Sequence, residues 1–129
     1  MPEVLRLPTD PIAPALARAS ITGVARDLPD VALADLNLLL TEVVSNAVRH
    51  ARTAGAHEIV VSVDLGDDRV TVTVSDPGPG FAADLGPYPD LVADPHDGRW
   101  GVFLLRRLAS DWAVERNAGR TKVWFAIDR

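Results

Sequence analysis

Three polar side chains interrupt the most apolar stretch of the sequence at a spacing that could build a site. Glu42, Asn46 and His50 follow one another at intervals of four residues, so on a helix they lie along one flank. Carboxylate, amide and imidazole groups accept hydrogen bonds or exchange protons, and here they would do so where a core meets the surface. Asn is a mediocre helix former, which indicates that the Asn46 side chain has a specific partner. A solvated helix edge is the alternative that this stretch leaves open.

The residues around this flank predict a long core helix. We expect it to run from about residue 31 to residue 52 and to end at Thr53-Ala54-Gly55. Apolar residues recur with a period near 3.6 and fall on one broad arc, which is typical of a helix packed on a core. The residues of this arc are Leu36, Leu39, Leu40, Val43, Val44, Ala47, Val48 and Ala51.

Asp76 is the second residue that could belong to a site. After the helix the apolar period changes to two, which predicts an antiparallel hairpin with strands near 57–65 and 70–76 and a turn at Gly66-Asp67-Asp68. Asp76 continues the apolar row of the second strand, so its carboxylate points toward the helices. Burial of a carboxylate without a hydrogen-bonded partner is costly. Either a turn amide or a donor from a ligand satisfies it.

A long aperiodic segment follows Asp76 and reaches to about residue 100. It contains five prolines and four glycines, and a loop of this length is typical of a lid or a binding loop. It ends at Gly101, just before a helix expected over 102–108, where free backbone N–H groups favour phosphate. The segment itself is acidic, so we expect phosphate binding to rely on backbone amides, on a metal ion and on Arg99.

The remaining elements complete a two-layer α/β (α+β) sandwich. A short edge strand near 4–7, a first helix near 12–28 that is weakened at Thr22-Gly23, and a last hairpin near 111–127 give a mixed, mostly antiparallel sheet covered on one face by three helices. Three aromatic residues in that hairpin are predicted to be core, with an aromatic platform for bases as the alternative: Trp112, Trp124 and Phe125.

Composition restricts the class of protein. The 129 residues fit a single domain, 1–129, and the absence of cysteine excludes disulfides. The net charge of −5 argues against a general nucleic-acid binder. The chain has no eighteen-residue apolar run and no basic leader, so we expect a cytoplasmic protein without a membrane segment.

Taken together, the motifs resemble those of the GHKL (histidine-kinase-like) ATPases. Glu42-x-x-x-Asn46-Ala47-x-x-His50 resembles the N-box of that superfamily, and Asp76-x-Gly78-x-Gly80 resembles its first glycine box. The lid, Gly101 and the late Gly119-Arg120-Thr121 follow in the family's order. Within the superfamily the chain is most similar to small stand-alone anti-sigma-factor serine/threonine kinases and related ATP-binding regulators.

The resemblance implies a Bergerat-type ATP-binding fold and a role for each matching residue. Asp76 would accept a hydrogen bond from the adenine amino group, Asn46 would ligate Mg²⁺, and Glu42 would be the general base. The remaining nucleotide-binding positions would be Gly78, Gly80, Arg99, Gly101, Val102 and Thr121. The implied ligands are ATP and ADP. The implied partners are an antagonist protein, phosphorylated on serine or threonine, and a sigma factor, with the chain itself a homodimer.

One departure from the family pattern affects phosphate binding. The second glycine box would have two glycines around one residue, whereas this chain has Arg99-Trp100-Gly101, with Gly98 one position early. We therefore keep two hypotheses: an ATP-dependent protein kinase, and a non-catalytic ATP-binding module that sequesters a partner. A histidine-kinase fragment is a weaker third, because no phosphoacceptor helix pair precedes the domain and the chain starts at Met1.

Overall fold

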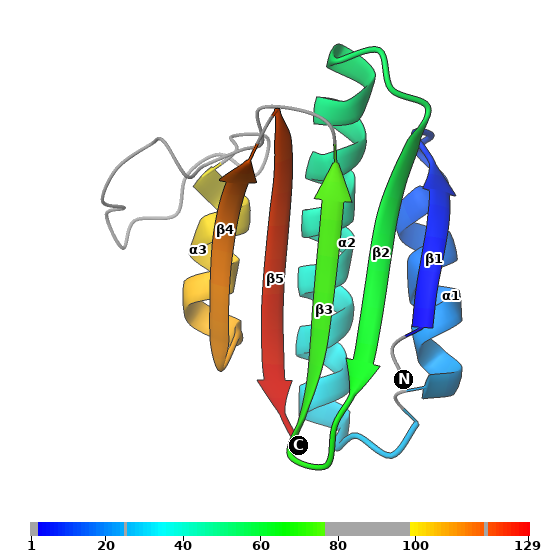
Figure 1. The fold of residues 1–129 in the computed structure, drawn as a ribbon. Coiled ribbons are helices and arrows are strands. Elements are labelled where there is room, and N and C mark those ends of the chain that lie inside the picture. The colour runs from blue at the N-terminus through cyan, green and yellow to red at the C-terminus, as the bar shows by residue number, and fades with distance from the viewer. Residues whose placement is uncertain (1–2, 25, 77–98, 118) are drawn as a thin grey trace.

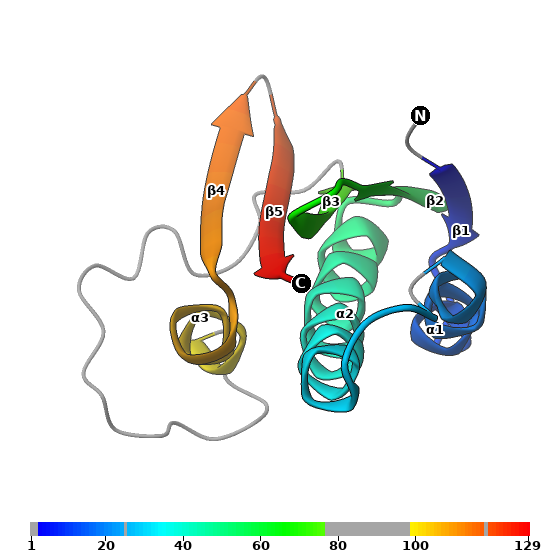
Figure 2. The same ribbon diagram turned by 90° about the horizontal axis from the view of Figure 1, so that it is seen from below.

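In the part of the chain that the structure describes, five strands and three helices form two layers. The computed structural model describes residues 3–24, 26–76, 99–117 and 119–129. The elements are β1 (Glu3–Pro8), α1 (Ala13–Val24), α2 (Asp30–Thr53), β2 (Glu58–Leu65), β3 (Arg69–Asp76), α3 (Arg99–Leu108), β4 (Asp111–Asn117) and β5 (Arg120–Asp128). The strand order is β1-β2-β3-β5-β4, and all three helices lie on one face of the sheet (Figures 1 and 2). The predicted two-layer sandwich is confirmed, and each of its four strand pairs is antiparallel.

Helix α2 lies along the middle of the sheet, between α1 and α3 (Figure 2). Every residue of the predicted apolar arc is buried, and Asn46 is buried with them. By length and hydropathy α2 could also cross a membrane. Its apolar arc, however, packs against strands β2, β3 and β5 and against the other two helices, so its hydropathy is explained by the core.

The end of α2 is a Schellman motif, which fixes where the chain turns back toward the sheet. Gly55 has a φ of 76°, a left-handed conformation that glycine adopts without a Cβ penalty. The Gly55 N–H donates to the carbonyl of Arg52, and the Ala56 N–H donates to the carbonyl of Ala51. The predicted stop at residues 53–55 is therefore confirmed, and β2 begins three residues after Gly55.

Helix α1 is shorter than the sequence suggested. It ends at Val24 rather than near residue 28, consistent with the expected weakness around Thr22-Gly23. Arg18 on α1 donates to the Thr41 hydroxyl on α2 over 2.7 Å, and Thr41 in turn donates to the carbonyl of Asn37. This contact between the two helices was not predicted from the sequence.

The three aromatic residues of the last hairpin do not all lie in the core, because successive residues of β5 point to opposite faces of the sheet. Phe125 is fully buried and Trp112, directly opposite it on β4, packs against the core. Trp124 is half-buried and lies between Thr73 of β3 and Ala113 of β4. It is on the face opposite the three described helices (Figure 2), because neighbouring strand residues point to opposite sides. The core prediction is therefore wrong for Trp124.

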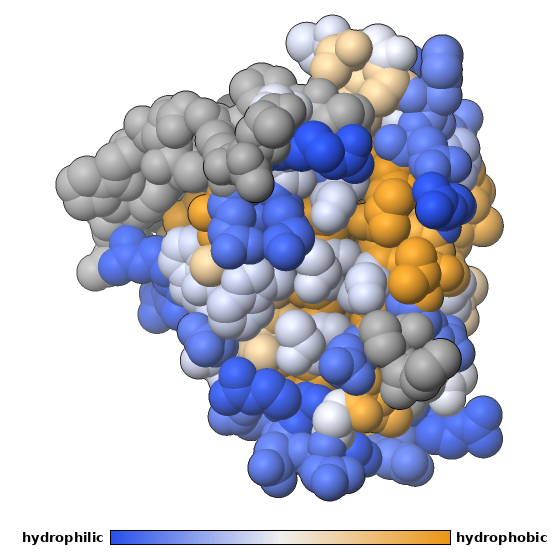
Figure 3. Space-filling model, viewed as in Figure 1, coloured by the Kyte–Doolittle hydropathy of each residue, from blue (hydrophilic) through white to orange (hydrophobic). Residues whose placement is uncertain are grey.

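The uncovered face of the sheet is largely polar. Figure 3 shows this face, with hydrophilic and neutral atoms over β3, β4 and β5 and apolar atoms gathered over β1 and β2. Two exposed ion pairs lie on this face. Lys122 pairs with Glu115 at 3.6 Å, and Arg6 pairs with Glu58 at 2.9 Å. Such exposed pairs add little stability, so the fold depends on the helix-covered face.

Candidate functional site

The predicted site residues gather at one end of the sandwich. Strand β3 ends there with Asp76, Thr121 is the second residue of β5, and α3 starts at the same end of the molecule (Figure 1). The C-terminal half of α2 runs to the same end of the molecule (Figure 1), and α2 contacts β3, β5 and α3. Four segments that are distant in the sequence therefore border one region.

The strand side of this region holds a buried polar pair. Asp76 and Thr121 are register partners on β3 and β5, with 2% and 0% of their surfaces exposed. Asp76 continues the buried row of β3, which confirms the inward direction expected from parity. A buried carboxylate beside a buried hydroxyl offers both an acceptor and a donor to a polar heterocycle.

The helix side of the region holds a buried amide with a cation against it. Asn46 is 2% exposed, and its Oδ1 accepts a hydrogen bond from Nη2 of Arg49. Glu42 lies one turn before Asn46 and is half-buried, as is His50 one turn after it. The predicted flank of three polar residues is therefore real, and its middle member is the most buried.

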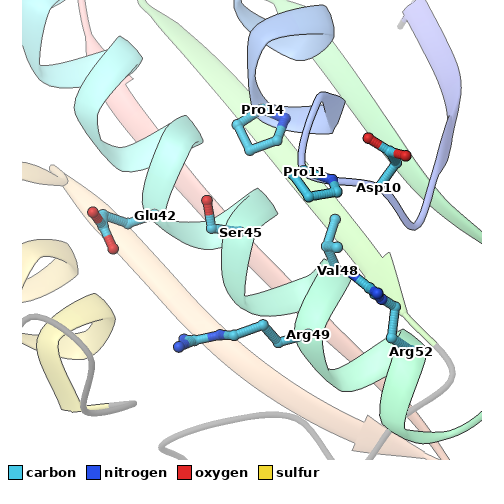
Figure 4. A pocket seen from close by; sticks show the side chains of 8 residues that line it. All are labelled: Asp10, Pro11, Pro14, Glu42, Ser45, Val48, Arg49 and Arg52. Atoms are coloured by element: carbon cyan, nitrogen blue, oxygen red, sulfur yellow. The ribbon is translucent and has the colours of Figure 1, made fainter.

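A pocket of about 390 Å³ opens beside Glu42, between α2 and the start of α1. The α2 side of the pocket is formed by Glu42, Ser45, Val48, Arg49 and Arg52, and the other side by Asp10, Pro11 and Pro14 (Figure 4). Glu42 thus lines this pocket, and its carboxylate extends away from the prolines on the other side (Figure 4). The basic residues of this pocket, Arg49 and Arg52, were not predicted to belong to a site, although their positions follow from the spacing along α2.

The start of α3 corrects one expectation. The helix begins at Arg99, so Gly101 lies in its first turn instead of preceding it, and the last two residues of the expected lid are helical. Gly101 and Val102 are both buried there. Two further predicted nucleotide-binding residues, Gly78 and Gly80, lie outside the described residues with most of the expected lid, and so does the Arg99 side chain.

The donor set fits a magnesium ion that is completed by other oxygens. Mg²⁺ binds amide and carboxylate oxygens and usually keeps several waters or substrate phosphates as ligands. The Asn46 amide oxygen is buried and accepts a hydrogen bond from a cationic group, so it is an oxygen to which a positive charge can bind. Within the described ranges no cluster of three His, Asp or Glu residues could hold a metal ion. A metal here would therefore depend on Asn46 and on the phosphates.

The structure is a two-layer α/β domain with the buried polar pair of Asp76 and Thr121 at one end of its antiparallel sheet. The chain belongs to the histidine kinase-like ATPase family, whose domain matches residues 7–127. The resemblance found in the sequence is thereby confirmed at the level of the family, and with it the use of ATP by this type of domain.

Relatives and solved structures agree with this assignment. The chain is 30% identical to the serine-protein kinase RsbW of Bacillus velezensis over 127 residues, which cover 91% of this chain and 79% of that protein. The structure of the RsbU and RsbW domains of Rv1364c from Mycobacterium tuberculosis has the same fold, with a TM-score of 0.74 and 23% identity over 100% of this chain and 33% of that one. In the SiaB-SiaC complex from Pseudomonas aeruginosa one chain has a TM-score of 0.63 and 10% identity, with coverages of 98% and 89%.

Proposed function

We propose that this protein is an ATP-dependent serine/threonine protein kinase of the anti-sigma-factor type. The observation that carries the proposal is the position of Glu42, which lies one helical turn from the buried Asn46 and also borders a surface pocket. A base in this position is near the proposed metal site on one side and open to a protein on the other. Similarity to the kinases named RsbW supports the same reaction.

Each residue has a distinct part in the proposed reaction. Asp76 and Thr121 would hold the adenine, and Asn46 would hold a magnesium ion, which would neutralise phosphate charge. Glu42 takes the proton of the acceptor hydroxyl as that oxygen bonds to the γ-phosphorus. The bond between the γ-phosphorus and the bridging oxygen breaks, and ADP leaves with that oxygen.

A non-catalytic module that binds ATP and sequesters a partner is the alternative function. The fold of one chain of the SiaB-SiaC complex supports a protein partner in either case, because that fold is found in a solved protein complex. The antagonist protein, the sigma factor, the homodimer and the cytoplasmic location stay predictions from the resemblance and the sequence.

A thermal melt tests the nucleotide specificity on which both functions depend. The purified protein would be heated with millimolar Mg-ATP, Mg-ADP or Mg-GTP. A ligand at about a hundred times its dissociation constant adds roughly 2.7 kcal/mol, which raises the midpoint by several degrees in a domain of this size. We expect a shift with both adenine nucleotides and none with GTP. Equal shifts with ATP and GTP would contradict Asp76 as the adenine-binding residue, and no shift would contradict the nucleotide site.

A further inference from the structure

Arg49 provides a positive charge at the amide that we assign to metal binding. Its Nη2 donates a hydrogen bond to Oδ1 of Asn46. The two residues differ sharply in exposure, since Arg49 is exposed whereas Asn46 is 2% exposed. The guanidinium therefore reaches from the surface to an oxygen that is otherwise enclosed.

The helix places this cation among the proposed reactive groups. Arg49 follows Asn46 by three residues and Glu42 by seven, so all three share one side of α2. Arg49 and Glu42 also line the same pocket, and their side chains extend toward the same side of the helix (Figure 4). The charge of Arg49 is thus held at the site by the regular geometry of α2.

An ordinary surface pair does not account for this contact. Pairs three residues apart on an exposed helix face contribute only a few tenths of a kcal/mol, because each group can turn to water instead. The Asn46 oxygen is buried, so without the guanidinium it would lose a hydrogen bond that water replaces poorly. Arg49 therefore provides the hydrogen bond that the buried Asn46 oxygen would otherwise lack in the protein without nucleotide.

We propose that Arg49 substitutes for the metal ion at Asn46 while the site is free of nucleotide, and moves away when Mg-ATP binds. This inference rests on the proposed function, because it takes Asn46 as the metal ligand. A guanidinium and a magnesium ion at one oxygen repel each other at close range, so the two cations compete. Arg49 then determines how much magnesium the protein needs to bind ATP tightly.

The competition has two measurable consequences. Removing the charge of Arg49 destabilises the nucleotide-free protein, because the Asn46 oxygen loses its partner. The same change leaves the Mg-ATP complex unaffected, because Arg49 has already left Asn46 there. By the closed thermodynamic cycle, magnesium must then bind more tightly to the variant together with ATP.

The test compares Arg49→Met with the matched control Arg52→Met. Met keeps the length and helix propensity of Arg without its charge, and Arg52 is an exposed residue of the same pocket. Magnesium would be titrated at a fixed, subsaturating concentration of a fluorescent ATP analogue, with an EDTA sample as reference. Melting midpoints would be recorded without nucleotide and at saturating Mg-ATP.

We expect Arg49→Met to reach half-saturation at roughly tenfold lower magnesium, as one hydrogen bond from a charged donor implies. Its midpoint without nucleotide should fall by about 4 to 7 °C and match the wild type at saturating Mg-ATP. Arg52→Met should follow the wild type in both measurements.

Two results would contradict this inference and leave the proposed function intact. One is that Arg49→Met reaches half-saturation at the same magnesium concentration as the wild type. The other is an equal loss of ATP affinity with magnesium and with EDTA, which would make Arg49 a phosphate ligand. If the wild type itself bound ATP equally with and without magnesium, the metal site of the proposed function would be wrong and the inference would fail with it.

Discussion

Asp76 and Thr121 lie directly opposite each other on β3 and β5, and both are buried at the end of the sheet toward which the C-terminal half of α2 runs (Figure 1). They are 45 positions apart in the sequence, and the pairing of β3 with β5 brings them together. A polar pair at this depth depends on hydrogen bonds for its stability, and the pairing of β3 with β5 places a carboxylate and a hydroxyl side by side at this end of the sandwich.

Replacement of Asp76 by Asn tests its part in adenine binding. The variant keeps the shape of the side chain but removes the charge and replaces one acceptor oxygen by an NH₂ group, so only an uncharged amide oxygen is left to accept a hydrogen bond. Hydrogen bonds to charged groups contribute about 1.5 to 3 kcal/mol, so ATP affinity should fall roughly ten- to a hundredfold by isothermal titration calorimetry. Asp64→Asn, at an exposed position of β2, is the control. Unchanged ATP affinity in Asp76→Asn would make Asp76 a purely structural carboxylate.

Glu42→Gln separates catalysis from binding. Gln cannot accept a proton from an attacking hydroxyl, so phosphoryl transfer and ADP release should fall by about 10²- to 10⁴-fold. The affinity for Mg-ATP, measured by fluorescence titration, should change little. Glu58→Gln, on the exposed side of β2, is the control. If ATP consumption survives in Glu42→Gln, a different residue is the base. If the wild type consumes no ATP with any acceptor, the non-catalytic alternative holds.

Asn46→Ala tests the metal ligand without involving catalysis. The change removes the buried amide oxygen, so ATP should bind about equally weakly with magnesium and with EDTA, whereas the wild type should bind more tightly with magnesium. Ser45→Ala, a half-buried neighbour that lines the pocket, controls for general effects of substitution on α2. A variant that keeps the wild-type response to magnesium would exclude Asn46 as a ligand.

Gly55→Ala tests how strongly the end of α2 is fixed. No atom lies within 4 Å of a Cβ added at Gly55, so the cost comes from the φ of 76° alone. A left-handed conformation costs an L-residue about 1 to 2 kcal/mol, which should lower the melting midpoint by several degrees. Gly23→Ala is the comparison. Gly23 lies inside α1, also has no atom within 4 Å of an added Cβ, and does not have a left-handed φ. We expect that variant to be neutral or slightly stabilising. A neutral Gly55→Ala would contradict the role of the turn.

Periodicity determined most of the fold from the sequence alone. The arc of α2 and the alternation of β3 each follow from which side chains avoid water, and the structure confirms both, down to the inward direction of Asp76. Gly55 determined the end of α2 for an equally local reason, because glycine adopts the left-handed turn without strain. These features depend only on neighbours in the chain, so a pattern in the sequence was enough.

Tertiary structure decided the features that depend on what packs against each residue. Parity alone could have placed Trp124 on the open face of β5, but its size and its apolar neighbours in the sequence favoured the core. The hydrogen bond from Arg18 to Thr41 needed the packing of α1 on α2. Arg49 became informative only once Asn46 was seen to be buried, because the same spacing on an exposed helix would mean an ordinary surface contact. The sequence determined which chemical groups are present, and burial decided which of them act together.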